Sequence, residues 1–499
     1  MKSWGGGYVT DVAYMPGYYR HQAPTHLELA CLLGGAAGIA PAADAPLSYV
    51  ELGCGLGFGA LALAASCPAW RVTAVDFHPA HIAGASALAA EAGIANVRFL
   101  ELDLAEVPAE PAEIPMADVV SLHGVWSWVS PTVREGIVRL LRARVRPGGI
   151  VHVSYNALPA WQGMHGMARL LRDGGRLLAG RSDRQAAEGM SLARDLAAAG
   201  AVHLAQSPMA AALLEHFPTL PAQYVAHEYI NDFWAPCFHA DVTETLADAK
   251  LEWVASANPA ENFPALTLTE AQRAVRDRFD DVRLRELIKD LCLPRGLRSD
   301  VFVRGARRLG NAARDTALGR VHLALLRHPD HFAYEAGVPA GTVELTQPAY
   351  GPIVAALAAT PRPVEALLAL PALEGRGNPA EVAAMLTQSE QVMPVCGPPT
   401  LPGDAARRFN RVVAGLVDGT NLDRSAALAT SGLGAPLPCQ MLDLWVLARL
   451  AETGAAPDAA AWADRLAAGR DEAERRRLED HLLKIVRERV PVWRALAIA

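Results

Sequence analysis

Three alternate glycines, with one acid before them and a second acid roughly 20 residues on, are the residues whose spacing points most clearly to chemistry. Gly53, Gly55 and Gly57 follow Glu51 at every second position. Glycines let the backbone turn sharply and approach a ligand that a Cβ atom would push away. Asp76 lies at the distance along the chain where an acid can bind both hydroxyls of a ribose. Because many strand–helix units carry a glycine turn, it is the turn and the acid together that predict nucleoside binding.

A strand–turn–helix unit is needed to position these residues, and the surrounding sequence predicts a series of such units. Short apolar runs predict strands, and Ala/Leu-rich stretches between them predict helices. The expected strands are residues 48–52, 71–76, 97–101, 117–122 and 149–154, and the expected helices are 59–67, 79–92 and 131–144. Such alternation is typical of an α/β fold with a doubly wound, parallel sheet.

Polar side chains lie at or just past the ends of four predicted strands: Glu51, Asp76, Asp103 and His123. Ligands of doubly wound sheets bind at the carboxyl ends of the strands, so we expect these four to converge on one rim. Asp103 lies between Leu102 and Leu104, an arrangement that could hold the edge of an adenine between apolar walls.

Length and charge exclude several other classes. With 499 residues, two or three domains are expected. A net charge of −7 argues against a nucleic-acid partner, which would require a basic surface. The seven cysteines form no CxxC pair or zinc spacing, so we expect no metal and a reducing, cytoplasmic setting. No segment is apolar enough for a signal peptide or for membrane insertion.

Two loops with aromatic and polar residues follow the fourth and fifth strands: residues 123–131, HGVWSWVSP, and residues 154–161, SYNALPAW. Both are expected on the ligand rim, where aromatics can surround an alkylammonium group. Tyr155 and Asn156 leave a strand at the mouth of the site and are favoured as functional. Trp128 is assigned mainly to packing.

The glycine turn and its acids resemble the first motif of the class I S-adenosylmethionine-dependent methyltransferases. The resemblance implies a Rossmann-like domain, an S-adenosylmethionine cofactor, Asp76 at its ribose and Asp103 near its adenine. A dehydrogenase is the competing reading, but Phe58 stands where the dinucleotide fingerprint has glycine. The residues expected against the cofactor are Tyr19, Glu51, Gly53, Gly55, Gly57, Asp76, Phe77, Asp103, Leu104 and His123.

The two loops are also similar to those of bacterial protein lysine methyltransferases that carry a methyltransferase regulatory domain, including rickettsial enzymes. Residues 224–231, YVAHEYIN, and 298–305, RSDVFVRG, resemble that family too. The loops depart from its pattern at Trp126, a common tyrosine, and at Ala160, a common glycine. The resemblance implies a protein or peptide substrate, with a lysine ε-amine as the acceptor. The candidate catalytic residues are His123, Tyr155 and Asn156, which would orient the amine, and Trp126 and Trp161, which would wall the channel.

Other functions stay open at this point. The chain could methylate another peptide side chain or a small metabolite, or bind the cofactor as a scaffold without turnover. A homodimer also stays open. A tyrosine among Tyr14, Tyr18 and Tyr19 could close over the ligand. For the pair His227–Glu228 we expect a structural hydrogen-bonding role, because adjacent helical residues point about 100° apart and cannot share a metal.

Three domains are expected along the chain. Residues 1–220 would form the cofactor-binding methyltransferase domain with a helical insertion, in which Ser182 and Gln185 predict a capping box. Residues 221–308 would form the helical regulatory domain. Residues 309–499 would form a mostly helical domain, and an alternating run at 342–346 suggests a winged-helix-like module.

Overall fold

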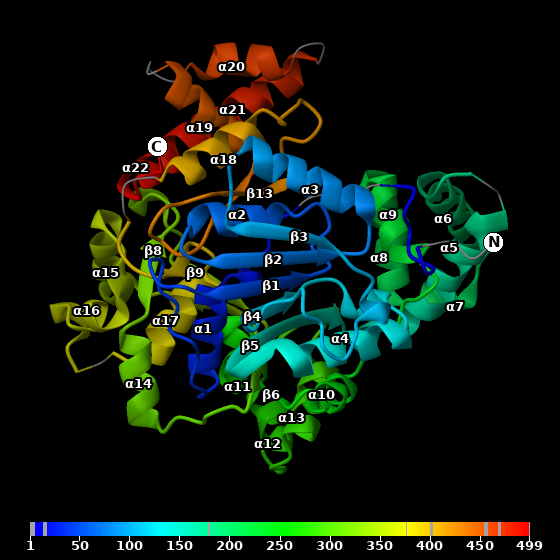
Figure 1. Ribbon diagram of the computed structural model, residues 1–499, viewed down its shortest axis with the longest axis horizontal. Coiled ribbons are helices and arrows are strands. Elements are labelled where there is room, and N and C mark those ends of the chain that lie inside the picture. The colour runs from blue at the N-terminus through cyan, green and yellow to red at the C-terminus, as the bar shows by residue number, and fades with distance from the viewer. Residues whose placement is uncertain are drawn as a thin grey trace.

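The computed structural model describes residues 5–12, 17–177, 180–375, 377–399, 403–453, 458–467 and 471–498. Its centre is a seven-stranded sheet of order β3-β2-β1-β4-β5-β7-β6 (Figure 1). β1 to β5 are parallel, and β7 runs antiparallel to both of its neighbours. The strands are β1 (Ser48–Leu52), β2 (Arg71–Asp76), β3 (Val97–Glu101), β4 (Ala117–Leu122), β5 (Val145–Asn156), β6 (Leu251–Ser256) and β7 (Leu297–Arg304). The predicted Rossmann-like fold is therefore confirmed.

Helices cover both faces of the sheet because successive side chains of each buried strand point to opposite faces. Tyr49 packs on one face, whereas Val50 and Leu52 pack on the other. The first face is covered by α1 (Pro24–Leu33), α2 (Phe58–Ser66) and α3 (Pro79–Glu91). The second is covered by α4 (Pro131–Arg144) and α10 (His239–Ala247). The sheet is thus buried on both sides, as its apolar strands require.

A helical layer lies beyond the carboxyl ends of the strands. It comprises α5 (His165–Leu177), α6 (Ser182–Ala198), α7 (Val202–Gln206), α8 (Pro208–His216) and α9 (Ala222–Tyr229), which share one apolar cluster with Val9 and Val12. The predicted capping box is wrong, because Ser182 belongs to the helix and Arg181 precedes it as the cap. The Ser182 hydroxyl instead donates to Asp11 Oδ1 at 2.6 Å, so that it ties the N-terminal segment to this layer.

The stretch expected as a regulatory domain is divided between two parts of the molecule. Its first helix, α9, packs in the helical layer, and its strands β6 and β7 complete the central sheet. Between those strands lie α11 (Pro264–Thr267), α12 (Glu270–Arg276) and α13 (Val282–Cys292). The boundaries at 220 and 308 stay predictions.

The remaining residues form helices with three small sheets. These sheets have the orders β11-β8-β12, β10-β9 and β13-β14. In Figure 1, α18 to α22 gather beyond α2. The ring centroids of Phe409 on α18 and Phe58 on α2 lie 5.7 Å apart. The elements are α14 (Asn311–Gly319), β8 (His322–Leu325), β9 (Glu335–Val338), β10 (Gly341–Glu344), α15 (Gln347–Ala359), β11 (Arg362–Pro363), α16 (Val364–Leu368), α17 (Pro379–Gln388), β12 (Val392–Val395), α18 (Asp404–Ala414), β13 (Ser425–Leu428), β14 (Leu437–Gln440), α19 (Met441–Thr453), α20 (Ala459–Leu466), α21 (Glu472–Glu488) and α22 (Val490–Ala495). No helix in the described ranges is both long and apolar enough to cross a membrane.

Candidate active site

The glycine turn after β1 has a backbone that side chains would disturb. Gly53, Gly55 and Gly57 have φ angles of +74°, +53° and +70°, which L side chains rarely adopt. A Cβ on Gly53 would lie 2.4 Å from Val125, and one on Gly57 would lie 2.5 Å from Phe99. A Cβ on Gly55 would meet nothing within 4 Å. Gly53 and Gly57 therefore allow close packing, whereas Gly55 faces open space.

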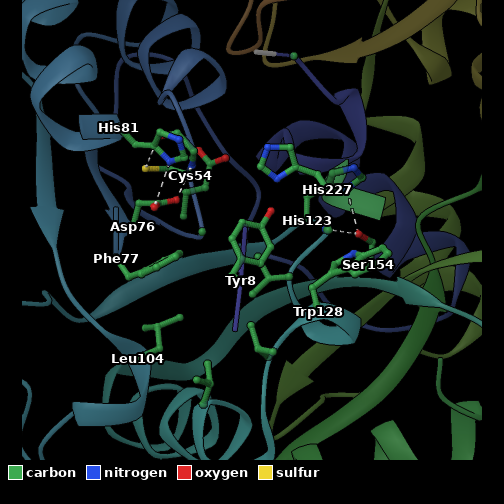
Figure 2. Close-up of a pocket in the computed structure, with 18 of the residues that line it drawn as sticks. Tyr8, Cys54, Asp76, Phe77, His81, Leu104, His123, Trp128, Ser154 and His227 are labelled. Carbon is green, nitrogen blue, oxygen red and sulfur yellow. Dashed lines mark hydrogen bonds and ion pairs between the residues drawn. The ribbon is translucent and has the colours of Figure 1, made fainter. Parts of the chain in front are cut away.

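That space is a cavity of about 610 Å³ at the carboxyl ends of the parallel strands. Its size falls within the range of small-molecule and cofactor sites. Figure 2 shows Asp76, Phe77 and Leu104 on one side of the view, His123, Ser154 and Trp128 on the other, and Tyr8 between them. The cavity brings together most of the predicted site residues: Tyr19, Glu51, Gly53, Gly55, Asp76, Phe77, Asp103, Leu104, His123, Asn156 and Trp161.

Asp76 braces the glycine turn from the end of β2. Its Oδ2 accepts a hydrogen bond from Gly55 N at 2.8 Å, and its Oδ1 accepts one from His78 N at 2.9 Å. His81 Nδ1 lies 3.3 Å from the same Oδ1 (Figure 2). The carboxylate is thus buried at the turn and lines the cavity, which is the placement expected of an acid that binds a ribose.

Glu51 is a second buried acid, on β1 directly before the turn. Its Oε1 accepts from Gln22 Nε2 at 3.2 Å, and the same Gln22 nitrogen donates to Ser121 Oγ at 3.1 Å. Burial raises the pKa of Glu51 to about 7; the charge of Asp76 adds to the rise and the Gln22 hydrogen bond opposes it. A positively charged group entering the cavity would favour the ionised carboxylate.

A cleft between apolar side chains lies at the end of β3. Leu102 and Leu104 line the cavity on either side of Asp103, and Phe77 joins them. Asp103 Oδ1 accepts from Ala105 N at 2.8 Å and so caps the short 3-10 helix that follows. The side chain combines the expected place on the cavity wall with a local capping role.

The end of the cavity near β4 and β5 contains neutral polar groups. His123 Nδ1 lies 3.1 Å from Ser154 Oγ, and the ring of Tyr19 stacks on His123 with centroids 3.9 Å apart. Burial lowers the pKa of His123 to about 4, so the imidazole is neutral at pH 7. Asn156 is held by its backbone N–H, which donates to Ser127 Oγ at 2.8 Å.

Two predicted catalytic residues lie away from the cavity. Tyr155 is buried in the core of the second sheet face, and its hydroxyl donates to Asp300 Oδ2 at 2.6 Å. Its neighbours Ser154 and Asn156 line the cavity, because alternate residues of β5 face opposite sides of the sheet. Trp126 is also buried in that core, with the Arg134 guanidinium 5.5 Å from its ring centroid. The expectations that Tyr155 orients the substrate and that Trp126 walls its channel therefore need correction.

Arg298 lies beneath this rim in a fully buried ionic network. Its Nε donates to Asp300 Oδ2 at 2.8 Å, in the same strand. Its other nitrogens bind Asp290 and Glu286 of α13, with shortest distances of 2.8 Å. Because Tyr155 also binds Asp300, the network joins β5, β7 and α13 below the cavity.

Several cavity residues were not singled out from the sequence as site residues. They include Tyr8, Gln22, Trp128, Tyr224 and Glu228. The sequence predicts mainly a packing role for Trp128. In the structure this residue packs beside Trp234 and also lines the cavity. The expected hydrogen-bonding role of His227 is confirmed, since its Nε2 lies 2.9 Å from Val12 O. Tyr14 lies outside the described residues. No cluster of three or more metal-ligating side chains occurs within the described ranges.

Comparisons with known proteins agree with this geometry. The family described as "Methyltransferase domain" matches residues 50–149, and the one described as "Predicted methyltransferase regulatory domain" matches residues 221–304. Uncharacterized protein sll1526 of Synechocystis is 32% identical over 355 residues, which cover 71% of this chain and 69% of that protein. Uncharacterized protein RP028 of Rickettsia prowazekii is 30% identical over 151 residues, 30% of this chain and 58% of that protein.

A solved structure shares the fold over nearly the whole length. PKMT2 from Rickettsia typhi, determined in complex with AdoHcy, superposes with a TM-score of 0.66 at 17% identity, covering 97% of this chain and 99% of that one. At that identity the match concerns architecture alone. The family matches and the Synechocystis relative decide the classification: this chain belongs to the class I S-adenosylmethionine-dependent methyltransferases that carry a methyltransferase regulatory domain.

Proposed function

We propose that the chain transfers a methyl group from S-adenosylmethionine to a protein side chain, and that the acceptor is a lysine ε-amine. The observation that carries the proposal is the cavity at Gly55, which is lined by two buried acids, Glu51 of β1 and Asp76 of β2. PKMT2 from Rickettsia typhi was solved with AdoHcy, the spent form of that cofactor, and shares this architecture. A protein or peptide partner, a homodimer and a cytoplasmic location belong to the same proposal.

The residues present fit this cofactor. Asp76 would bind the ribose hydroxyls, and Leu102, Asp103 and Leu104 would hold the adenine edge. Glu51, buried and with a raised pKa, would gain its charge beside the ammonium of the cofactor's amino-acid part. Gly55 leaves the space that a Cβ would occupy.

The cofactor supplies, when bound, a methyl group on a positively charged sulfur that is already activated for transfer. The chain's own contribution is alignment of the acceptor, which can supply much of the rate enhancement. His123, neutral and stacked on Tyr19, and Asn156 line the cavity and would orient the acceptor nitrogen. Trp128 and Trp161 line the same cavity and would help to exclude water from it.

The first test is calorimetry with AdoHcy on the wild type, Glu51→Gln and the surface control Glu215→Gln. We expect binding by the wild type and the control, and at least tenfold weaker binding by Glu51→Gln, since its amide cannot pair with an ammonium. Absence of binding by the wild type would contradict the cofactor assignment.

The second test separates the candidate reactions. The protein is incubated with methyl-labelled S-adenosylmethionine and a cell lysate, and labelled bands are mapped by mass spectrometry. Label on protein lysines supports the proposal, and label on other side chains or only on small molecules supports the corresponding alternative. AdoHcy binding without any label would support a scaffold without turnover.

A further inference from the structure

The cavity contains a fourth acid, Glu228, that the cofactor assignment does not use. Glu228 lies on α9 and lines the cavity together with Tyr224, four residues earlier. Residues four apart share one face of a helix, so α9 presents this pair to the cavity. His227, which stands between them in the sequence, also lines the cavity, and its Nε2 lies 2.9 Å from Val12 O; Tyr229 packs in the apolar cluster of the helical layer.

Two tyrosines that line the cavity, Tyr8 and Tyr224, lie near enough to this acid for its charge to raise their pKa values. Tyr8 lies on the cavity wall with its ring 5.6 Å from that of His227 and 5.9 Å from that of Phe77. Burial raises the pKa of Tyr224 to about 12, and the negative charge of Glu228 adds to the rise. Burial, then Asp76, then Glu228 raise the pKa of Tyr8 above its usual value. The charges of Asp76 and Glu228 therefore both act on Tyr8 within the same cavity.

Burial alone raises the pKa of Glu228 to about 7. A buried carboxylate is costly unless a cation or hydrogen-bond donors accompany it. Faces of aromatic rings also attract cations, and they accommodate the alkyl groups that a cation carries. Carboxylate and rings together match an alkylammonium better than they match a hydroxyl or an anion.

We propose that Glu228, together with Tyr8 and Tyr224, forms the acceptor site, an inference that rests on the proposed function. The Glu228 carboxylate binds the ammonium of a lysine-type side chain and takes its proton. One N–H bond breaks, the proton goes to a Glu228 carboxylate oxygen, and the electron pair stays on nitrogen as the nucleophilic lone pair. The substrate class is therefore a primary or partly methylated amine.

The magnitudes favour Glu228 over His123 as the proton acceptor. An acid with a pKa of about 7 holds a proton roughly 1,000-fold more tightly than an imidazole with a pKa of about 4. A lysine ammonium has a pKa of about 10.4 in water, roughly three units above that of Glu228. Desolvation can lower a lysine pKa by up to about 3–5 units and so narrows the gap, whereas the attraction between ammonium and carboxylate acts in the opposite direction.

The test uses two AdoHcy analogues that need no known substrate. Both have nitrogen in place of sulfur; one carries a butylammonium arm where the methyl group would depart, and the other carries a plain butyl arm. Calorimetry measures both, and AdoHcy, on the wild type and on Glu228→Gln. In the wild type we expect the ammonium arm to bind about 10- to 100-fold more tightly than the butyl arm.

Glu228→Gln should lose this preference while it binds AdoHcy normally, which also shows that the cavity is folded. Glu51→Gln provides the opposite control, because it should weaken all three ligands and keep the preference for the ammonium arm. Equal binding of the two arms by the wild type, or a preference that survives in Glu228→Gln, would overturn the inference. If the wild type does not bind AdoHcy, the proposed function fails instead.

Discussion

At the residue scale, Glu51 is expected to make stability depend on pH. Its pKa is about 7 in the folded protein and 4.5 for an ordinary glutamate. The folded state therefore binds the proton more tightly, and the contribution of Glu51 to the free energy of unfolding falls as pH rises from about 4.5 to about 7. The loss is on the order of 3 kcal/mol at most.

Glu51→Gln keeps the acceptor for Gln22 and removes the buried charge. We expect this variant, without cofactor, to be more stable than the wild type by about 1–3 kcal/mol at pH 8 and nearly equal to it at pH 5. Urea unfolding at both pH values measures the difference. A difference that does not change with pH would show that the Glu51 carboxylate is not the cause.

Gly55→Val tests the opening of the cavity. The valine would project into space that the cofactor needs and would strain a φ of +53°. We expect AdoHcy affinity to fall by more than 100-fold, as measured by calorimetry. Gly305→Val is the matched control, because it has a φ of +66° with nothing within 4 Å of the added Cβ and does not line the cavity. Equal losses in both variants would assign the effect to backbone strain.

Local spacing predicted the position of Glu51 and Asp76 because the chain itself links them to the glycine turn. Local spacing did not predict the positions of Tyr8, Tyr224 and Glu228. These residues reach the cavity only through tertiary packing of α9 and the N-terminal segment. The error at Tyr155 has a simple cause. The sequence predicted a strand that ends at 154, whereas β5 continues to Asn156 and turns Tyr155 to the opposite face.

At the scale of elements, the predicted parallel strands agree with the structure because each is a compact apolar run. The sequence did not predict that β6 and β7 would join the same sheet as β1 to β5. β7 pairs with β5 across more than a hundred residues, and Leu297 lies opposite Asn156. Such pairing depends on long-range packing that periodicity within one segment does not record.

Replacing Arg298 tests how strongly the ionic network between β7 and α13 stabilises the structure at the rim of the cavity. Arg298→Ala would leave Asp300 buried without a guanidinium partner, whereas Glu286 keeps its ion pair with Lys289 and Asp290 keeps its pair with Arg295. Breaking a buried ion pair in this way costs about 3–5 kcal/mol, and we expect that loss in urea unfolding. Arg285→Ala is the control on the same helix, since Arg285 pairs with a fully exposed Asp280 and should cost under about 1 kcal/mol. Similar losses for the two variants would contradict the role of the network.

At the scale of the whole molecule, the C-terminal region is part of the wall behind the cofactor cavity. Arg408 on α18 donates to Ala92 O at 3.1 Å, and Thr430 N donates to Ser66 Oγ at 3.0 Å. Phe58, the first residue of α2, lines the cavity, and its ring packs against that of Phe409 on α18. The region beyond residue 308 therefore supports the helix that begins at the glycine turn.

Phe409→Ala should consequently affect stability and binding together. Phe409 is fully buried, and removing its ring costs about 3–5 kcal/mol and leaves Phe58 room to move. We expect AdoHcy affinity, measured by calorimetry on the protein that remains folded, to fall by about 5- to 20-fold, a loss of about 1–2 kcal/mol. Phe332→Ala removes an equally large ring from a different apolar cluster and should destabilise the protein without changing affinity. If Phe409→Ala binds AdoHcy as the wild type does, the C-terminal region stabilises the fold but does not shape the cavity.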